Sequence, residues 1–129
     1  MTKTILGVQA PKAEAKAAVA LDKNCPFYGE LNVKKASLVG TIIKKDAHGT
    51  ATIEWERSRF VPKYERFEFR RSRIRVHNPA SINAQIGEKV LVARTRPIRK
   101  TKHHVIIKVI ADEVTEKAAK SKTKKSKTE

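Results

Sequence analysis

The residues with the clearest chemical meaning are the arginines, all of which lie between Arg57 and Arg99. A guanidinium group is planar and permanently charged, and its fork of N–H donors matches a phosphate group. The densest cluster spans positions 63–75 and interleaves cations with aromatic rings: Lys63, Tyr64, Arg66, Phe67, Phe69, Arg70, Arg71, Arg73 and Arg75. Because such cations clamp phosphates while a ring can stack on an exposed base, this stretch predicts contact with RNA or DNA. A plain solvated basic face is the alternative.

The aromatic residues near this cluster have two possible roles. For Phe67 and Phe69 we favour packing in the core over base stacking, and for Trp55 we favour the core or the rim of a barrel. For Tyr64, which lies beside a predicted loop, stacking and packing are equally supported.

Two further groups of basic residues surround predicted turns. The second cluster lies in a connection that Pro97 should stiffen, and its members are Arg94, Arg96, Arg99, Lys100, Thr101 and Lys102, with His103 beside them. The third, Lys44, Lys45 and His48, lies at the tip of a predicted hairpin. We predict nucleic-acid contacts at both groups, and also at His77, which closes the first cluster.

Catalysis and metal binding find little support in the residue spacing. The single cysteine, Cys25, has no partner for a disulfide or a zinc site, and we expect a packed, inert thiol there. The histidines lack the spacing of metal ligands, the carboxylates are mostly flanked by cations, and the glycines form no phosphate-binding loop. We therefore predict no enzyme activity, no catalytic residue, no metal or other cofactor and no small-molecule substrate.

The overall charge identifies the class of partner. The 129 residues carry 29 Lys and Arg against 13 Asp and Glu, a formal net charge of +16. Nucleic acid is the commonest neutralising partner and an anionic membrane the second, but no apolar run approaches the ~20 residues that span a bilayer. We expect no membrane association. One cysteine without a disulfide favours a reducing, cytoplasmic setting.

The charge also divides the chain into three parts. Residues 1–35 hold six Lys and three acids, residues 36–112 hold seventeen Lys and Arg and seven acids, and residues 113–129 hold six Lys and three acids. We predict a domain at 36–112, flanked by an N-terminal extension with a helical or binding-dependent stretch at 11–20 and a loop at 24–29. The Lys-rich tail at 113–129 should be disordered when unbound.

The hydrophobic pattern of the domain predicts an all-β fold. Strands are expected at 38–45, 51–56, 67–76, 89–94 and 105–110, and Ile82 and Ile86 indicate a short helical segment between the third and fourth. In the third strand the apolar residues change parity, which predicts a bulge or bend near 70–73. This order is typical of a five-stranded OB-fold, a Greek-key barrel that binds nucleic acids, although periodicity alone also allows an SH3-like barrel.

Several motifs resemble the ribosomal protein S-seventeen family of the small subunit, in its archaeal form. They are Asn24-Cys25-Pro26-Phe27-Tyr28-Gly29-Glu30-Leu31, Tyr64-Glu65-Arg66-Phe67, Arg70-Arg71-Ser72-Arg73-Ile74, His77-Asn78-Pro79, Gly87-Glu88-Lys89-Val90, Arg96-Pro97-Ile98 and Lys100-Thr101-Lys102. The resemblance covers roughly 24–110. It implies an OB-fold that contacts small-subunit (16S-type) RNA and neighbouring ribosomal proteins, helps fold the 5′ domain of that RNA during assembly, and acts in the cytoplasm. Matched positions imply RNA contact at Arg70, Arg71, Arg73, Arg96, Lys100 and Lys102.

A different class of function would be a mobile OB-fold module that binds RNA or single strands outside the ribosome. Such a module needs several exposed stacking aromatics on the barrel face. The chain has few aromatic residues, and most are expected in the core, so the structural ribosomal role is favoured.

Overall fold

The computed structural model describes residues 4–10 and 22–110. Its elements are β1 (Thr4–Ile5), β2 (Val8–Gln9), β3 (Val33–Asp46), β4 (Thr50–Val61), the 3-10 turn η1 (Pro62–Tyr64), β5 (Arg66–His77), β6 (Lys89–Arg99) and β7 (Lys102–Ile110). The predicted helical stretch at 11–20 and the predicted tail at 113–129 lie outside the described residues.

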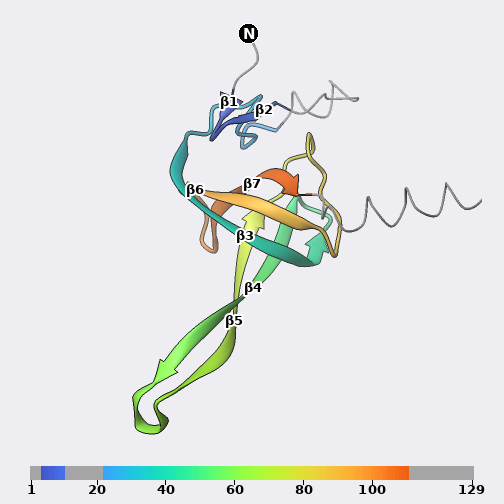
Figure 1. Cartoon of the computed structure of the whole chain (residues 1–129). Helices are drawn as coiled ribbons and strands as arrows, with labels where there is room; N and C mark the ends of the chain where they lie inside the picture. Colours follow the sequence, from blue (N-terminus) through green and yellow to red (C-terminus); the bar gives the residue numbers. More distant parts are fainter. Residues whose placement is uncertain (1–3, 11–21, 111–129) are drawn as a thin grey trace, which may run out of the picture.

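Five of these strands close into a barrel in the order β3-β4-β5-β7-β6 (Figure 1). All neighbours are antiparallel except β5 and β7, which run parallel. The first half of β3 pairs with β6 and the second half with β4, so one bent strand closes the ring. Where β3 passes from one partner to the other, a Cβ on Gly40 would meet the carbonyl oxygen of Glu54 at 3.1 Å, a tight contact that β4 would have to shift slightly to relieve. This closed Greek-key arrangement confirms the predicted OB-fold.

The core follows from strand alternation. On β4, Ala51 and Ile53 point inward and are buried, and Trp55 is partly buried against the same cluster, as predicted for the core or the rim. A second cluster closes one end of the barrel, where Cys25 and Phe27 pack together with residues of β6 and β7. The predicted packing of Cys25 is confirmed, since 1% of its surface is exposed.

The connection between β5 and β6 is not the predicted helical segment. Backbone N–H groups of Ile82 and Asn83 bond to the carbonyl of Pro79, which makes a single turn. The buried side chain of Asn78 then donates to the carbonyl of Ala84 at 3.0 Å and accepts its N–H at 3.1 Å. Because Asn83 adopts a φ of 45°, the helical path ends at this residue. The prediction of a helix was wrong because Asn78 supplies the hydrogen bonds that a second helical turn would have made.

The hairpin of β4 and β5 extends far beyond the barrel as an arm (Figure 1). The two strands pair without a register shift from Thr50↔His77 to Val61↔Arg66. Of the predicted bulge or bend near 70–73, the bulge was wrong for this pair of strands; the register shift on β5 lies against β7, between Arg75 and His77. The apolar residues change parity because the inner half of β5 faces the core while the outer half has left it. At the tip, Pro62 starts the tight turn η1, and Glu65 adopts the left-handed conformation with φ 49°.

Residues 4–10 of the N-terminal extension form a small hairpin of β1 and β2. Leu6 and Gly7 both have positive φ, as a two-residue turn between antiparallel strands requires. Ile5 and Val8 pack against the second core cluster, so the hairpin covers one end of the barrel. Within the described residues, no helix is both long and apolar enough to cross a membrane.

Candidate nucleic-acid interface

An open groove on the barrel brings together residues that are far apart in the sequence. Its walls come from the turn between β3 and β4, from β5 and from the turn between β6 and β7: Lys45, Asp46, Ala47, His48, Thr50, Arg75, Arg99, Thr101 and Lys102. Members of all three predicted basic clusters therefore meet here. His48, Arg75, Arg99 and Thr101 are exposed and offer charged or hydroxyl donors suited to phosphate oxygens.

Local geometry on β6 and β7 explains how this groove forms. Arg99 pairs with Lys102, so Lys100 and Thr101 form a two-residue turn. The ladder is irregular between Arg94 and Arg99, where Pro97 has no N–H to donate. The predicted basic linker is thus largely strand, and Arg96 and Lys100 project from it as exposed side chains.

Lys102 and His77, both predicted to contact RNA, are buried side chains, although Lys102 also lines the groove. The Lys102 ammonium donates to Thr50 Oγ1 at 2.9 Å and to His77 Nδ1 at 3.4 Å, and only 4% of the residue is exposed. Burial, reinforced by the charge of Arg99, lowers the pKa of Lys102 below 10.5. Because a Lys ammonium has no acceptor, His77 carries its ring proton on Nε2, which donates to Asp22 Oδ2 at 2.9 Å. Both residues brace the loop at Asp22 against the barrel.

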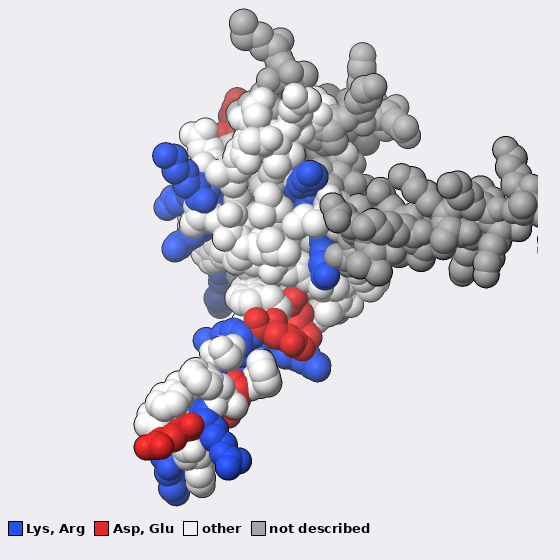
Figure 2. Space-filling model, in the orientation of Figure 1, with Lys and Arg blue, Asp and Glu red and all other residues white. Residues whose placement is uncertain are grey.

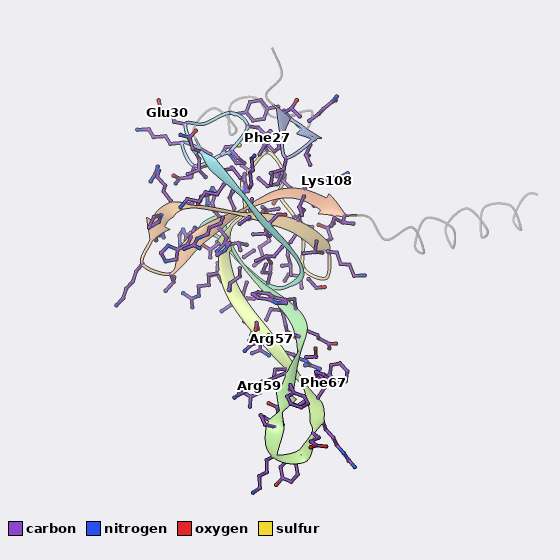
Figure 3. The ribbon with its side chains drawn as sticks, turned by 60° about the vertical axis from the view of Figure 1, so that its left-hand side comes forward. Phe27, Glu30, Arg57, Arg59, Phe67 and Lys108 are labelled. Carbon is purple, nitrogen blue, oxygen red and sulfur yellow. The ribbon has the colours of Figure 1, made fainter. Side chains whose placement is uncertain are left out.

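The arm has two faces, since side chains alternate along each strand and paired residues share a side. One side, here called the arginine face, consists of Arg57, Arg59, Val61, Arg66, Glu68 and Arg70. The outer half of the other side, here called the phenylalanine face, carries Phe60, Phe67 and Phe69, with Ser58 opposite Phe69. Figure 3 labels Arg57, Arg59 and Phe67, which lie on the arm outside the barrel.

Ion pairs occupy some of the predicted RNA-binding arginines. The Glu54 carboxylate forms ion pairs with Arg73 at 2.6 Å and with Arg71 at 3.7 Å, and Glu68 forms one with Arg70 at 2.6 Å. These side chains stay largely exposed, and such surface pairs contribute only ~0–1 kcal/mol. A phosphate can therefore compete for the same guanidinium groups.

Two arginines that the sequence analysis missed have no acidic partner within the described residues. Arg57 and Arg59 are exposed and share the side of β4 that carries Ile53 and Trp55 in the barrel. Their alternation with polar residues directly after Trp55 is the signal that could have identified them. Arg66, a predicted contact across the hairpin, is likewise exposed and without an ion pair in the described part.

The aromatic residues of the arm lie in solvent. Phe67 is 68% and Phe69 83% exposed, so the prediction that they pack in the core was wrong. The ring of Phe60 contacts that of Phe67, with centroids 5.2 Å apart and a tilt of 57°. Tyr64 is 65% exposed, and the Lys63 ammonium lies 5.5 Å from its ring centroid.

The remaining predicted positions are spread over the barrel. Arg94 is exposed, and Lys44 is exposed with Asp46 at 3.8 Å. Lys45 donates to Asn83 Oδ1 at 2.6 Å, which ties the first turn to the β5–β6 connection. Figure 2 shows the basic side chains on the barrel and along the arm, with acidic side chains where the arm leaves the barrel.

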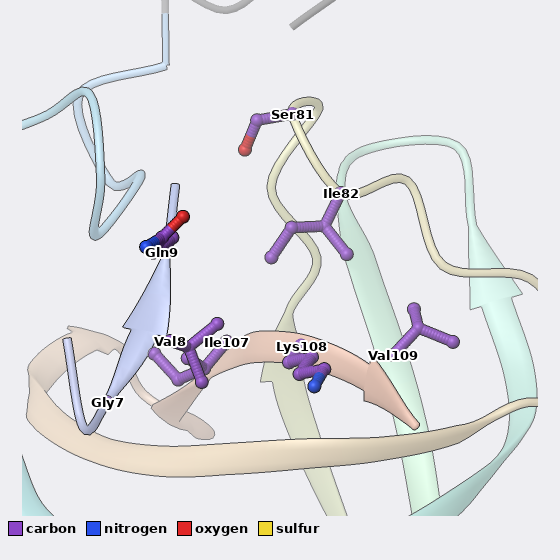
Figure 4. A pocket seen from close by; sticks show the side chains of 8 residues that line it. All are labelled: Gly7, Val8, Gln9, Ser81, Ile82, Ile107, Lys108 and Val109. Atoms are coloured by element: carbon purple, nitrogen blue, oxygen red, sulfur yellow. The ribbon is translucent and has the colours of Figure 1, made fainter. Parts of the chain in front are cut away.

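A second hollow, between the β1–β2 hairpin and the barrel, has a different character (Figure 4). Its lining is largely apolar and uncharged apart from Lys108, with Val8, Ile82 and Ile107 among its walls. It lacks the converging polar groups that bind a charged ligand. Among the described residues, no three His, Cys, Asp or Glu side chains are placed to hold a metal ion.

The barrel and its exposed cations define a basic OB-fold protein. The model of one protein family, described as Ribosomal protein S17, matches residues 40–108. The chain belongs to this family, as the motifs in the sequence indicated.

Archaeal relatives extend the similarity beyond the barrel. The protein called small ribosomal subunit protein uS17 in Haloarcula marismortui is 42% identical over 108 residues, covering 84% of this chain and 94% of the relative. The protein of the same name in Methanopyrus kandleri is 45% identical over 111 residues, covering 85% and 90%. That of Methanocaldococcus jannaschii is 40% identical over 109 residues, covering 83% and 89%.

Proposed function

We propose that this chain is a structural constituent of the small ribosomal subunit, that it binds small-subunit RNA directly, and that it supports folding of the 5′ domain of that RNA during assembly in the cytoplasm. Family membership supports the ribosomal role, and the role is structural rather than catalytic. The observation that carries the RNA contact is the set of exposed arginines without acidic partners in the described part: Arg57, Arg59, Arg66, Arg75, Arg94, Arg96 and Arg99.

Two surfaces divide the binding. The groove on the barrel holds phosphates at Arg75 and Arg99, with His48, Thr101 and Lys100 around them. The arginine face of the arm binds further phosphates, and Arg71 and Arg73 exchange their carboxylate partners for phosphate oxygens. Most of the affinity comes from phosphates and RNA shape, so binding weakens steeply with salt. Neighbouring ribosomal proteins are further partners in this proposal.

The alternative of a mobile single-strand binder needs stacking rings on the barrel face. The exposed rings carried by described strands are those of Phe60, Phe67 and Phe69, and all lie on the arm. Their position favours an arm anchored in a large folded RNA over a barrel that tracks one strand.

The decisive experiment is sedimentation of the cellular protein through a sucrose gradient at moderate salt. Co-migration with small subunits is expected, and a protein found only at the top of the gradient would overturn the ribosomal role. In a second experiment, the purified chain is titrated with a 5′-domain transcript and with an equally long transcript from another domain. Equal affinity for the two would contradict the role in 5′-domain folding.

A further inference from the structure

The phenylalanine face is an exposed apolar surface that contributes to neither core cluster. Phe60, Phe67 and Phe69 are 49%, 68% and 83% exposed, although side chains of this kind normally bury their rings. Both core clusters are built from other residues and are complete without them. A contiguous apolar patch on a soluble protein marks an interaction surface.

The three rings are arranged as a short row. Phe60 lies directly opposite Phe67 in the ladder, and their rings touch with a 57° tilt. Phe69 follows two residues along the same strand and side, about 7 Å further toward the barrel. This row offers several ring faces and edges on a continuously paired hairpin, a surface on which flat apolar ligands can stack.

The positive charge of the arm favours a negatively charged partner for this row of rings. On the opposite side of the same hairpin, Arg57 pairs directly with Arg70, and like charges in this position destabilise an isolated hairpin. A polyanion alongside the arm removes that repulsion. A second copy of this basic chain would instead add positive charge.

We propose that the phenylalanine face stacks on unpaired bases of the same RNA whose phosphates the arginine face binds. This inference rests on the proposed function and adds the class of ligand for one face of the arm. Every base has an apolar π face, and unstacked bases in loops and bulges are the usual targets of exposed aromatic rings. The arm thus reads an irregular RNA site, with cations on one side and rings on the other.

The test uses the double variant Phe67→Ser/Phe69→Ser with a small-subunit RNA transcript. Ile86→Ser is the matched control, because Ile86 is 62% exposed but lies on the β5–β6 connection away from the arm. Affinity is measured at several salt concentrations, and dimethyl sulfate reactivity of unpaired bases is read with and without protein. The double variant should bind about 5- to 150-fold more weakly for each base that loses its ring. Its salt dependence should stay unchanged, and bases protected by the unaltered chain should become reactive again.

A rescue variant and a stability measurement separate stacking from misfolding. Phe69→Trp keeps an aromatic ring and should retain both affinity and base protection. All four proteins should melt at similar temperatures, since these side chains lie outside the core.

Other results would overturn the proposal. Unchanged affinity in the double variant, or weaker binding with base protection intact, would exclude stacking. Normal RNA affinity with reduced incorporation into small subunits would assign the face to a protein partner, and loss of self-association would assign it to a second copy. Failure of the unaltered chain to bind the transcript would contradict the proposed function itself.

Discussion

The ammonium of Lys102 lies 3.4 Å from Nδ1 of His77, buried beneath the groove that Lys102 helps to line. The same ammonium donates to Thr50, and His77 continues the chain of hydrogen bonds to Asp22. A residue from the most basic turn of the chain therefore links β7, β4, β5 and the loop before β3.

Replacing Lys102 with Met should reduce stability more than it reduces RNA affinity. The unbranched apolar side chain of Met keeps most of the volume but leaves the buried acceptors at Thr50 and His77 without their donor, which costs about 1–3 kcal/mol. Urea unfolding measures this loss, and Arg99→Ala is the matched control because Arg99 is exposed. Arg99→Ala should show the reverse pattern, with normal unfolding and weaker RNA binding. If Lys102→Met weakened RNA binding as much as Arg99→Ala, the residue would have to contact RNA.

The environment of His104 predicts a pH effect on stability. Burial, then the charges of Arg94 and His103, lower the pKa of His104 below 6.5. As the pH falls through 6.5, the His104 ring takes up a proton in the unfolded chain before it does so in the folded protein. The contribution of neutral His104 to the free energy of unfolding is therefore complete above pH 6.5, and it is lost as the pH falls toward the pKa of the folded state. Arg94→Ala should raise the pKa of His104, as measured by NMR titration of the ring. Arg57→Ala, on the arm, is the control and should leave this titration unchanged.

The double hydrogen bond of Asn78 to Ala84 should stabilise the whole barrel. Asn78→Ala leaves a buried N–H and a buried carbonyl without partners, at about 1–3 kcal/mol for each group. Thermal unfolding followed by circular dichroism should show a lower midpoint with unchanged strand content. Asn83→Ala, at an exposed position of the same connection, is the contrast. It removes the exposed hydrogen bond from Lys45 and replaces Asn with a residue that tolerates positive φ less well, but it leaves no buried group without a partner. An equal loss in both variants would argue against the special role of Asn78.

Several residues show what the hydrophobic pattern of the sequence can and cannot predict. Alternation at Ala51, Ile53 and Trp55 correctly predicted an inward-facing strand, because burial on one side of a sheet leaves a direct mark on the sequence. Phe67 and Phe69 carry the same mark, yet they are exposed, since the pattern does not tell where a strand leaves the barrel. The burial of Lys102 and His77 depends on contacts between distant segments, which local periodicity does not record. The basic groove was predicted as three separate clusters, and only the barrel topology brings them together.

The like-charged pair on the arm should affect stability and binding in opposite directions. Arg57→Thr removes the repulsion from Arg70 and places a strand-favouring residue there, which should stabilise the free protein by about 0.2–1 kcal/mol. The same change should weaken RNA binding and reduce the slope of log affinity against log salt by about 0.7–0.9. Ser58→Thr, at the next position on the opposite side of the strand, serves as the control for strand propensity. An unchanged salt slope for Arg57→Thr would show that this guanidinium does not contact a phosphate.

The groove and the arm should act as independent contributors to RNA affinity. Arg75 lines the groove and Arg70 belongs to the arm, and the five residue steps from one to the other along β5 correspond to about 17 Å of strand. Changes at sites this far apart, without shared partners, usually add within about 0.5 kcal/mol. The double variant Arg57→Ala/Arg99→Ala should therefore lose the sum of the two single losses in binding free energy, and the reductions in salt slope should also add. A double variant no weaker than Arg57→Ala alone would mean that the groove binds RNA only when the arm is already in place, and the two surfaces would then form one cooperative site.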